Sequence, residues 1–162
     1  MESEQQVFSV LPTAAPEVLA IFCGDPRIQR PVNEFLHQTL GLTDGAYVPL
    51  TVPGGVASFT EASALPKEFK YVKDAVELYL TLFPSIGRII LINHEDCGKY
   101  KALREKIGPF FRLAENLTQR HVDDLAVVEK VLQAMLPRRV SFERYYAKFA
   151  NPEHTQLIFE GH

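Results

Sequence analysis

The side chains best suited to hold a metal ion in this sequence are Cys23, His94 and Cys97. The chain contains two cysteines, and the histidine lies three residues before the second, in the stretch "HEDCG". Two thiolates and one imidazole form a donor set that favours zinc over harder cations. Three protein ligands leave the fourth tetrahedral position open, which distinguishes catalytic zinc from structural zinc. We therefore predict that Cys23, His94 and Cys97 bind Zn²⁺.

A second reactive group follows the first cysteine in the stretch "CGDPR". Side chains alternate along an extended chain, so Cys23, Asp25 and Arg27 share one face. Pro26 favours an extended Asp25, because the residue before a proline is pushed out of the helical region. Arg27 is placed to hold Asp25 as a carboxylate. The pair could orient a water on the metal, Asp25 could itself become the fourth ligand, or the two could form a plain structural ion pair.

Short apolar runs lead into these groups. Residues 18–24 ("VLAIFCG") and 88–93 ("RIILIN") are typical of strands covered on both faces, as in a parallel sheet. Residues 46–52 form a further candidate strand, which ends in "PGG". Functional residues gather at the carboxyl ends of parallel strands, and both cysteines lie near such ends. Cys23 would therefore lie beside His94 and Cys97 if the strands at 18–24 and 88–93 pair.

Helical patterns alternate with these strands. An apolar stripe predicts a helix over 66–83, a second stripe predicts one over about 112–135, and a shorter helix is predicted over 31–40, ending at Gly41. The segment from 140 to 161 is typical of a strand, a turn and a strand. The fold class is therefore α/β: a mostly parallel central sheet flanked by helices, with an antiparallel edge from the C-terminal strands. We expect residues 1–162 to form a single domain.

The composition excludes several classes of partner. The net charge is −3 and no basic block is present, which argues against nucleic acid or an anionic membrane surface. No stretch reaches the ~20 apolar residues needed to span a bilayer. The start, "MESEQQVFSV", lacks the basic end and apolar core of a signal peptide, which predicts a cytoplasmic protein. Cysteines in that reducing compartment stay unpaired.

Other polar and aromatic residues receive plainer interpretations. Glu95 and Asp96 are interpreted as turn and capping acids rather than ligands, and Lys99 as a solvated surface lysine. His121 falls on the apolar stripe of its helix, which predicts a packed or interface histidine rather than a ligand. The aromatic residues near the second cysteine could wall an apolar pocket or simply fill the core, and they are Tyr100, Phe110 and Phe111.

The split pattern C-x-D-x-R and H-x-x-C-G resembles the β-class carbonic anhydrases. That resemblance implies that Cys23, His94 and Cys97 hold zinc and that Asp25 and Arg27 form the catalytic pair. It also implies a β-carbonic-anhydrase-like fold and reversible hydration of carbon dioxide to bicarbonate by a zinc-bound hydroxide. A homodimer or a dimer of dimers is expected, because members of the family complete their pockets with a neighbour.

The chain departs from the pattern of that family at Pro26, at Pro53 in "TVPGG", and at Lys99, where the family usually has small residues or an Arg-Asn pair. These departures leave the candidate ligands intact but alter the pocket wall. Two alternative functions therefore stay open. One is a zinc hydrolase of carbonyl sulfide or carbon disulfide. The other is a non-catalytic zinc-binding module in which Asp25 closes the site.

Overall fold

The computed structural model describes residues 8–60, 65–107 and 117–162. Strands and helices alternate through most of this chain, as the sequence predicts. The elements, in chain order, are β1 (Val18–Cys23), α1 (Gln29–Glu34), the π-helical turn η1 (Phe35–Thr39), β2 (Tyr47–Val52), α2 (Ala57–Thr60), α3 (Pro66–Leu82), β3 (Arg88–His94), α4 (Gly98–Ile107), α5 (Leu117–Met135), β4 (Ser141–Phe149) and β5 (Leu157–Gly161).

The strands form one mixed sheet in the order β2-β1-β3-β4-β5. β1 pairs in parallel with β2 on one side and with β3 on the other, and β3 pairs in parallel with β4. β5 adds an antiparallel edge to β4. The predicted fold class is therefore confirmed. β2 lies at the other edge and contains Pro49, which has no backbone N–H. An edge strand tolerates a proline because one side of the strand needs no hydrogen bonds to a neighbour.

The central strands are apolar on both faces because both faces are covered. All six residues of β1 are buried, and they divide between two cores by alternation. Val18, Ala20 and Phe22 pack with α1, whereas Leu19 and Ile21 pack with α3 and α5. Burying each of these larger side chains stabilises the fold by about 1.5–3 kcal/mol. The all-apolar run is thus the sequence signature of a strand inside a layered α/β fold.

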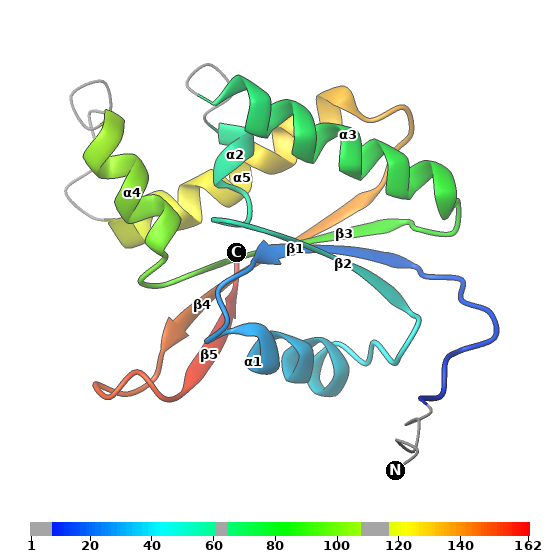
Figure 1. Ribbon diagram of the computed structural model, residues 1–162, viewed down its shortest axis with the longest axis horizontal. Coiled ribbons are helices and arrows are strands. Elements are labelled where there is room, and N and C mark those ends of the chain that lie inside the picture. Colours follow the sequence, from blue (N-terminus) through cyan, green and yellow to red (C-terminus); the bar gives the residue numbers. More distant parts are fainter. Residues whose placement is uncertain (1–7, 61–64, 108–116) are drawn as a thin grey trace, which may run out of the picture.

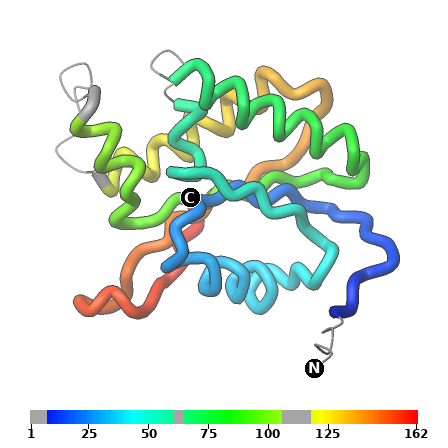
Figure 2. Tube along the Cα trace, viewed as in Figure 1, coloured from blue at the N-terminus to red at the C-terminus, as the bar shows by residue number. Residues whose placement is uncertain are grey.

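The helices lie in two layers around the sheet (Figure 1). α1 covers one face, α2, α3 and α5 cover the other, and α4 lies over the end at which β1 stops. Figure 2 shows the chain crossing below the sheet between β1 and β2, and above it between β2 and β3. The direction of winding therefore reverses at β1. Such a reversal opens a crevice at the carboxyl ends of the strands, here between β1 and β3.

Two of the predicted helices keep their stripes, and one differs in detail. On α3, Val72 and Val76 are buried, and on α5, Leu125 is fully buried, as are Val128 and Leu132. The predicted start of the second helix at 112, with Leu113, lies outside the described residues. The predicted 31–40 helix begins earlier and ends in the π-helical turn η1, and Gly41 follows it with φ +69°. Of these features, the sequence indicated only the helix end at Gly41, because glycine is the usual residue in the left-handed conformation that follows a helix.

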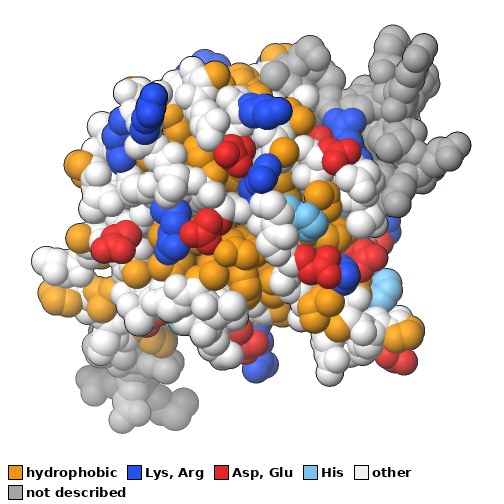
Figure 3. All heavy atoms as spheres, turned by 180° about the vertical axis from the view of Figure 1, so that it is seen from behind, with side chains coloured by type: hydrophobic (Ala, Val, Ile, Leu, Met, Phe, Trp, Pro, Cys, Tyr) orange, Lys and Arg blue, Asp and Glu red, His pale blue; other side chains and the backbone are white. Residues whose placement is uncertain are grey.

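Charged side chains of both signs are interspersed on the face seen in Figure 3, and no single-sign field forms there. None of the described helices is both long enough and apolar enough to cross a membrane.

Candidate metal site

Cys23 ends β1, and a glycine loop comes down onto its sulfur. The backbone N–H of Gly54 donates a hydrogen bond to Cys23 Sγ at 3.3 Å. Gly54 and Gly55 have φ of +78° and +56°, and a Cβ on Gly55 would lie 3.2 Å from the Cys23 nitrogen. Any side chain at Gly55 would therefore push the loop off the strand. The "PGG" loop that follows β2 therefore contacts Cys23 directly, through the Gly54 N–H and the close approach of Gly55.

His94 is the last residue of β3, one position further along than the predicted strand. It is buried, and its Nδ1 lies 2.8 Å from the Glu95 carbonyl oxygen. Its Nε2 is buried without a hydrogen-bond partner in the described part of the chain. A buried imidazole nitrogen without a partner is costly unless something else binds it. The carbonyl contact holds the ring through Nδ1 and leaves Nε2 as the atom that could bind a metal.

The turn between His94 and Cys97 depends on Asp96. Its φ is +59°, a left-handed conformation that aspartate tolerates better than most residues. This reversal brings Cys97 back over the strand end, immediately before Gly98 begins α4. Glu95 and Asp96 lie in this turn as predicted, but none of the hydrogen bonds described for their carboxylates caps α4. Glu95 also accepts a hydrogen bond from Phe149 N, which ties the turn to β4.

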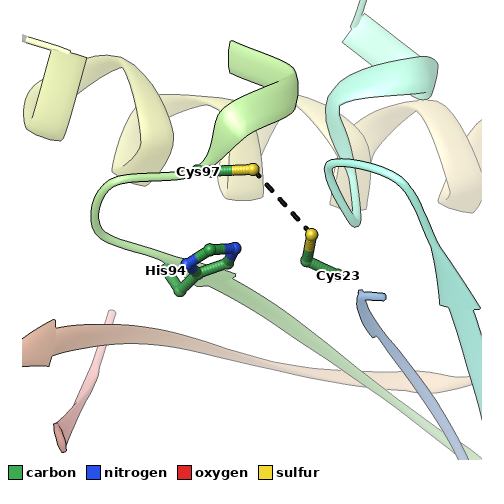
Figure 4. A group of neighbouring side chains, drawn as sticks. All are labelled: Cys23, His94 and Cys97. Carbon is green, nitrogen blue, oxygen red and sulfur yellow. Dashed lines mark hydrogen bonds between the residues drawn. The ribbon is translucent and has the colours of Figure 1, made fainter. Parts of the chain in front are cut away.

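The predicted ligands converge in the crevice between β1 and β3. One donor atom from each of Cys23, His94 and Cys97 lies within 4.8 Å of the other two, and the sulfurs are 3.9 Å apart (Figure 4). Two thiolates bound tetrahedrally to zinc at ~2.3 Å would be separated by about 3.8 Å. The donor types, the sulfur spacing and the unpartnered His94 Nε2 all fit zinc. The three residues could therefore hold a zinc ion.

The two thiols do not ionise alike. The pKa of Cys23 is lowered, first by a hydrogen bond with Cys97 and then by His94 and Gly54, although burial opposes the shift. The pKa of Cys97 is raised, because it shares its proton with Cys23 and because it is buried. The pair thus retains one proton, which a dication would displace. Metal affinity is expected to rise with pH for this reason.

Asp25 and Arg27 form the expected ion pair beside this group. Arg27 Nη2 donates to Asp25 Oδ2 at 2.7 Å, and Nε lies 3.1 Å from Oδ1. The Arg27 backbone N–H donates to Oδ1 as well, at 2.9 Å. Arg27 also reaches across to Asp96, with Nη1 3.0 Å from its carboxylate and Nη2 3.1 Å from its carbonyl oxygen. One guanidinium thereby links the segment after β1 to the turn after β3.

The pKa of Asp25 is lowered, chiefly by its hydrogen bonds with Arg27. Arg27→Gln is therefore expected to raise the Asp25 pKa toward its ordinary value of ~3.9. A depressed folded-state pKa stabilises the fold above the unfolded-state pKa, and this stability is lost as pH falls through the folded-state value. The stability difference between wild type and variant should thus be present at neutral pH and shrink in acid. Carboxyl NMR of Asp25 and urea unfolding at several pH values measure both effects.

The control for that experiment is Arg30→Gln, since Arg30 pairs with Glu34 on α1 and its side chain is 87% exposed. It should change neither the Asp25 pKa nor the pH profile. An Asp25 pKa that is the same in the Arg27 variant as in wild type would contradict the assignment of the shift to Arg27.

Lys99 differs from its sequence interpretation, because it is not a solvated lysine. Its side chain is only 19% exposed, and its Nζ donates to both carboxylate oxygens of Glu68, at 2.9 and 2.7 Å. Glu68 lies in the first turn of α3, so the pair joins α3 to α4. Periodicity along one helix carries no information about a partner on another, which explains the error.

A buried polar network behind the site was missed by the sequence reasoning. Asn93, next to His94 on β3, donates to Tyr100 OH at 3.0 Å and to the His121 carbonyl at 2.8 Å. Tyr100 OH donates to Asp124 at 2.9 Å, and Arg120 Nε lies 2.7 Å from the same carboxylate. Asp124 lies beside the apolar stripe of α5, and an acid at such a position could have indicated a buried polar network.

This network settles the role of one aromatic residue. Tyr100 is 5% exposed and packs within the core of the described residues. His121 packs against it with ring centroids 4.1 Å apart and is 2% exposed, which confirms the packed histidine. Phe110 and Phe111 lie outside the described residues.

Comparison with known proteins identifies the fold. A scan of family models finds no match to this sequence, and a search of curated proteins finds none either. Solved structures do match. A β-carbonic anhydrase from Aspergillus fumigatus superposes with a TM-score of 0.55 over 92% of this chain and 76% of its own, at 16% identity. A carbonic anhydrase from Streptococcus mutans gives 0.58 over 94% and 87%, at 13% identity.

The fold is that of the β-carbonic anhydrases. A further member, from Trichomonas vaginalis, matches over 95% of this chain and 87% of its own at 12% identity, with a TM-score of 0.55. The predicted resemblance is therefore confirmed at the level of structure. Identities this low establish a shared β-carbonic-anhydrase fold alone, so the activity of the present chain has to be argued from its own residues.

Proposed function

We propose that this protein catalyses the zinc-dependent, reversible hydration of carbon dioxide to bicarbonate. One observation carries the proposal. Cys23, a member of the donor group, borders a pocket of about 340 Å³ that is also lined by Asp25, whose two carboxylate oxygens are held by Arg27. A metal donor group, an oriented acceptor and space for a small molecule therefore adjoin one another, as a hydration reaction requires.

Zinc in this group would act as a Lewis acid and lower the pKa of water toward about 7, which supplies a nucleophile near neutral pH. The residues of the chain do the rest. Asp25 stays ionised because Arg27 lowers its pKa, so it can only accept a hydrogen bond. Pro26 and Pro53 give the pocket an uncharged wall that suits a small apolar substrate. Glu95 O orients His94 through Nδ1.

The alternative of a closed, non-catalytic zinc requires Asp25 on the metal. Three hydrogen bonds from Arg27 to the carboxylate, together with the backbone N–H, would have to break for that. The arrangement thus favours an open site. Hydrolysis of carbonyl sulfide or carbon disulfide would use the same groups, and only an assay separates the substrates.

The test is stopped-flow carbon dioxide hydration by the zinc-loaded protein, with Asp25→Asn as the variant. Removing one positioned hydrogen-bonding group from a reaction site costs about 10²–10³-fold in rate, so we expect the variant to lose roughly 100-fold while keeping its zinc. Asp44→Asn is the matched control, because the Asp44 side chain is 84% exposed. A background rate from fully zinc-loaded wild type would reject the proposal and direct the assay to carbonyl sulfide and carbon disulfide.

We also propose that the protein acts in the cytoplasm as a homodimer or a dimer of dimers. Both cysteines are free and buried, which suits a reducing compartment. The outer face of α3 exposes Tyr71, Leu78 and Leu82, which suits burial against a second copy. Light scattering after size-exclusion chromatography measures the mass of the assembly, and a monomer at micromolar concentration would reject this part of the proposal.

A further inference from the structure

Two cavities adjoin each other beside the candidate metal group. The first is the pocket of about 340 Å³ that contains Cys23 and Asp25. The second, of about 380 Å³, lies against α3 and is lined by Val52, Glu68 and Tyr71 among others. Lys99 and Pro53 line both. Pro53 has a short, rigid side chain in the loop after β2. The long side chain of Lys99 therefore determines whether the two cavities are separate.

The stem of Lys99 is fixed at both ends. Its backbone lies in the first turn of α4, directly after Gly98. Its ammonium group is held by both oxygens of Glu68, and Glu68 is held in turn by Ser58 Oγ at 3.2 Å. A long side chain tethered in this way loses the rotamer freedom that a surface lysine keeps.

Between those ends, the methylene groups lie directly on Gly54. A Cβ built on Gly54 would come within 2.5 Å of Lys99 Cγ and 2.8 Å of Lys99 Cβ. The glycine and the lysine stem are therefore complementary in shape. This contact also covers the loop whose N–H donates to the Cys23 sulfur.

The ammonium group contacts Glu68, which lines the second cavity and not the first. The metal pocket thus receives the apolar stem while the charge is neutralised outside it. An apolar wall of this kind excludes large molecules from the pocket and adds no charge to it, which suits a small neutral substrate.

We propose that Lys99 is a specificity-determining residue: its tethered stem is the partition that separates the metal pocket from the cavity beside α3 and limits the pocket to small molecules. The inference deepens the proposed function and rests on it for the identity of the site. Shortening Lys99 should join the two cavities and admit larger molecules.

The test uses zinc-free protein and requires no catalysis. Cys23 lines the metal pocket, so its rate of alkylation reports which reagents can enter. Iodoacetamide serves as the small reagent and N-pyrenylmaleimide as the bulky one, and peptide mapping separates Cys23 from Cys97. The ratio of the two rate constants at Cys23 cancels any change in the reactivity of the thiol itself.

Lys99→Ala is expected to raise the bulky-to-small ratio about tenfold, since a few methylene groups in a pocket discriminate by roughly 10–200-fold. Lys99→Met keeps the stem without the charge and should leave the ratio within about twofold of wild type. Glu68→Ala frees the ammonium end and should give a smaller rise of about threefold, which keeps the test available if Lys99→Ala does not fold.

An unchanged ratio in both Lys99→Ala and Glu68→Ala would overturn the partition. So would a rise in Lys99→Met equal to that in Lys99→Ala, because charge rather than bulk would then control entry. These outcomes are independent of the hydration assay. A failure of the proposed activity with the expected ratios would leave Lys99 as the partition of a pocket that serves another substrate.

Discussion

Replacing Cys97 with alanine is expected to weaken zinc binding by about 10²–10⁴-fold. Structural zinc binds proteins with apparent free energies of about 10–16 kcal/mol, and removing one of three protein ligands should forfeit roughly a quarter to a third of that. The corresponding loss of affinity is about 10²–10⁴-fold. Cys97 is 2% exposed, so no neighbouring side chain can enter its place without rearrangement of the turn. Competition with a chromophoric chelator measures the affinity directly.

The matched control for zinc binding is His37→Ala, which removes an imidazole on η1 that belongs to no donor group in the described chain. Its affinity should equal that of wild type. Because zinc stabilises only the form that binds it, added zinc should raise the melting temperature of wild type more than that of the Cys97 variant. Unchanged affinity in Cys97→Ala would mean that the metal binds elsewhere.

Asp124→Ala is expected to cost about 1–3 kcal/mol of folding stability, because it leaves the buried Tyr100 hydroxyl without its acceptor. Asp124 is 3% exposed and accepts from Tyr100 at 2.9 Å and from Thr60 at 3.3 Å, besides pairing with Arg120. A loss of this size is a large fraction of the 5–15 kcal/mol typical of a folded domain. Urea unfolding measures it as a fall in the midpoint.

The neighbouring acid supplies the control for Asp124. Asp123 is exposed and bonds only to Gln119 among the contacts described, so Asp123→Ala should cost less than about 0.5 kcal/mol. The network joins α5 to Tyr100 on α4 and to Asn93 beside His94, so Asp124→Ala should also weaken zinc retention. Equal unfolding midpoints for the two variants would show that the buried network contributes little.

The sequence predicts this fold well where the residue type at a position depends only on its local environment, such as burial on both faces of a strand. β1 and β3 are continuously apolar because both faces of the sheet are covered, and that pattern alone identifies them as central strands. The metal group follows from the same logic. Cysteine and histidine at the ends of two strands become neighbours as soon as those strands pair, and the pairing of Val18 with Arg88 sets the register.

What escapes the sequence is contact between elements whose separation depends on packing. Lys99 and Glu68 each look like solvated surface residues, and only the distance between α3 and α4 turns them into a partly buried ion pair. Asp96 in the left-handed conformation and Arg27 spanning two loops are likewise consequences of how the strand ends meet. The π-helical turn at Phe35 carries no pattern that distinguishes it from an α-helix.

The position of the metal donors also sets an order of events during synthesis. Cys23 emerges from the ribosome long before Cys97, 74 residues later, and the two meet only when β3 pairs with β1. A nascent chain that ends before β3 therefore offers a metal one thiol and no crevice. Contacts so distant in sequence also form slowly. If the group holds zinc as proposed, its uptake would mark completion of the central strand pair, and a truncated chain would lack the complete set of donors.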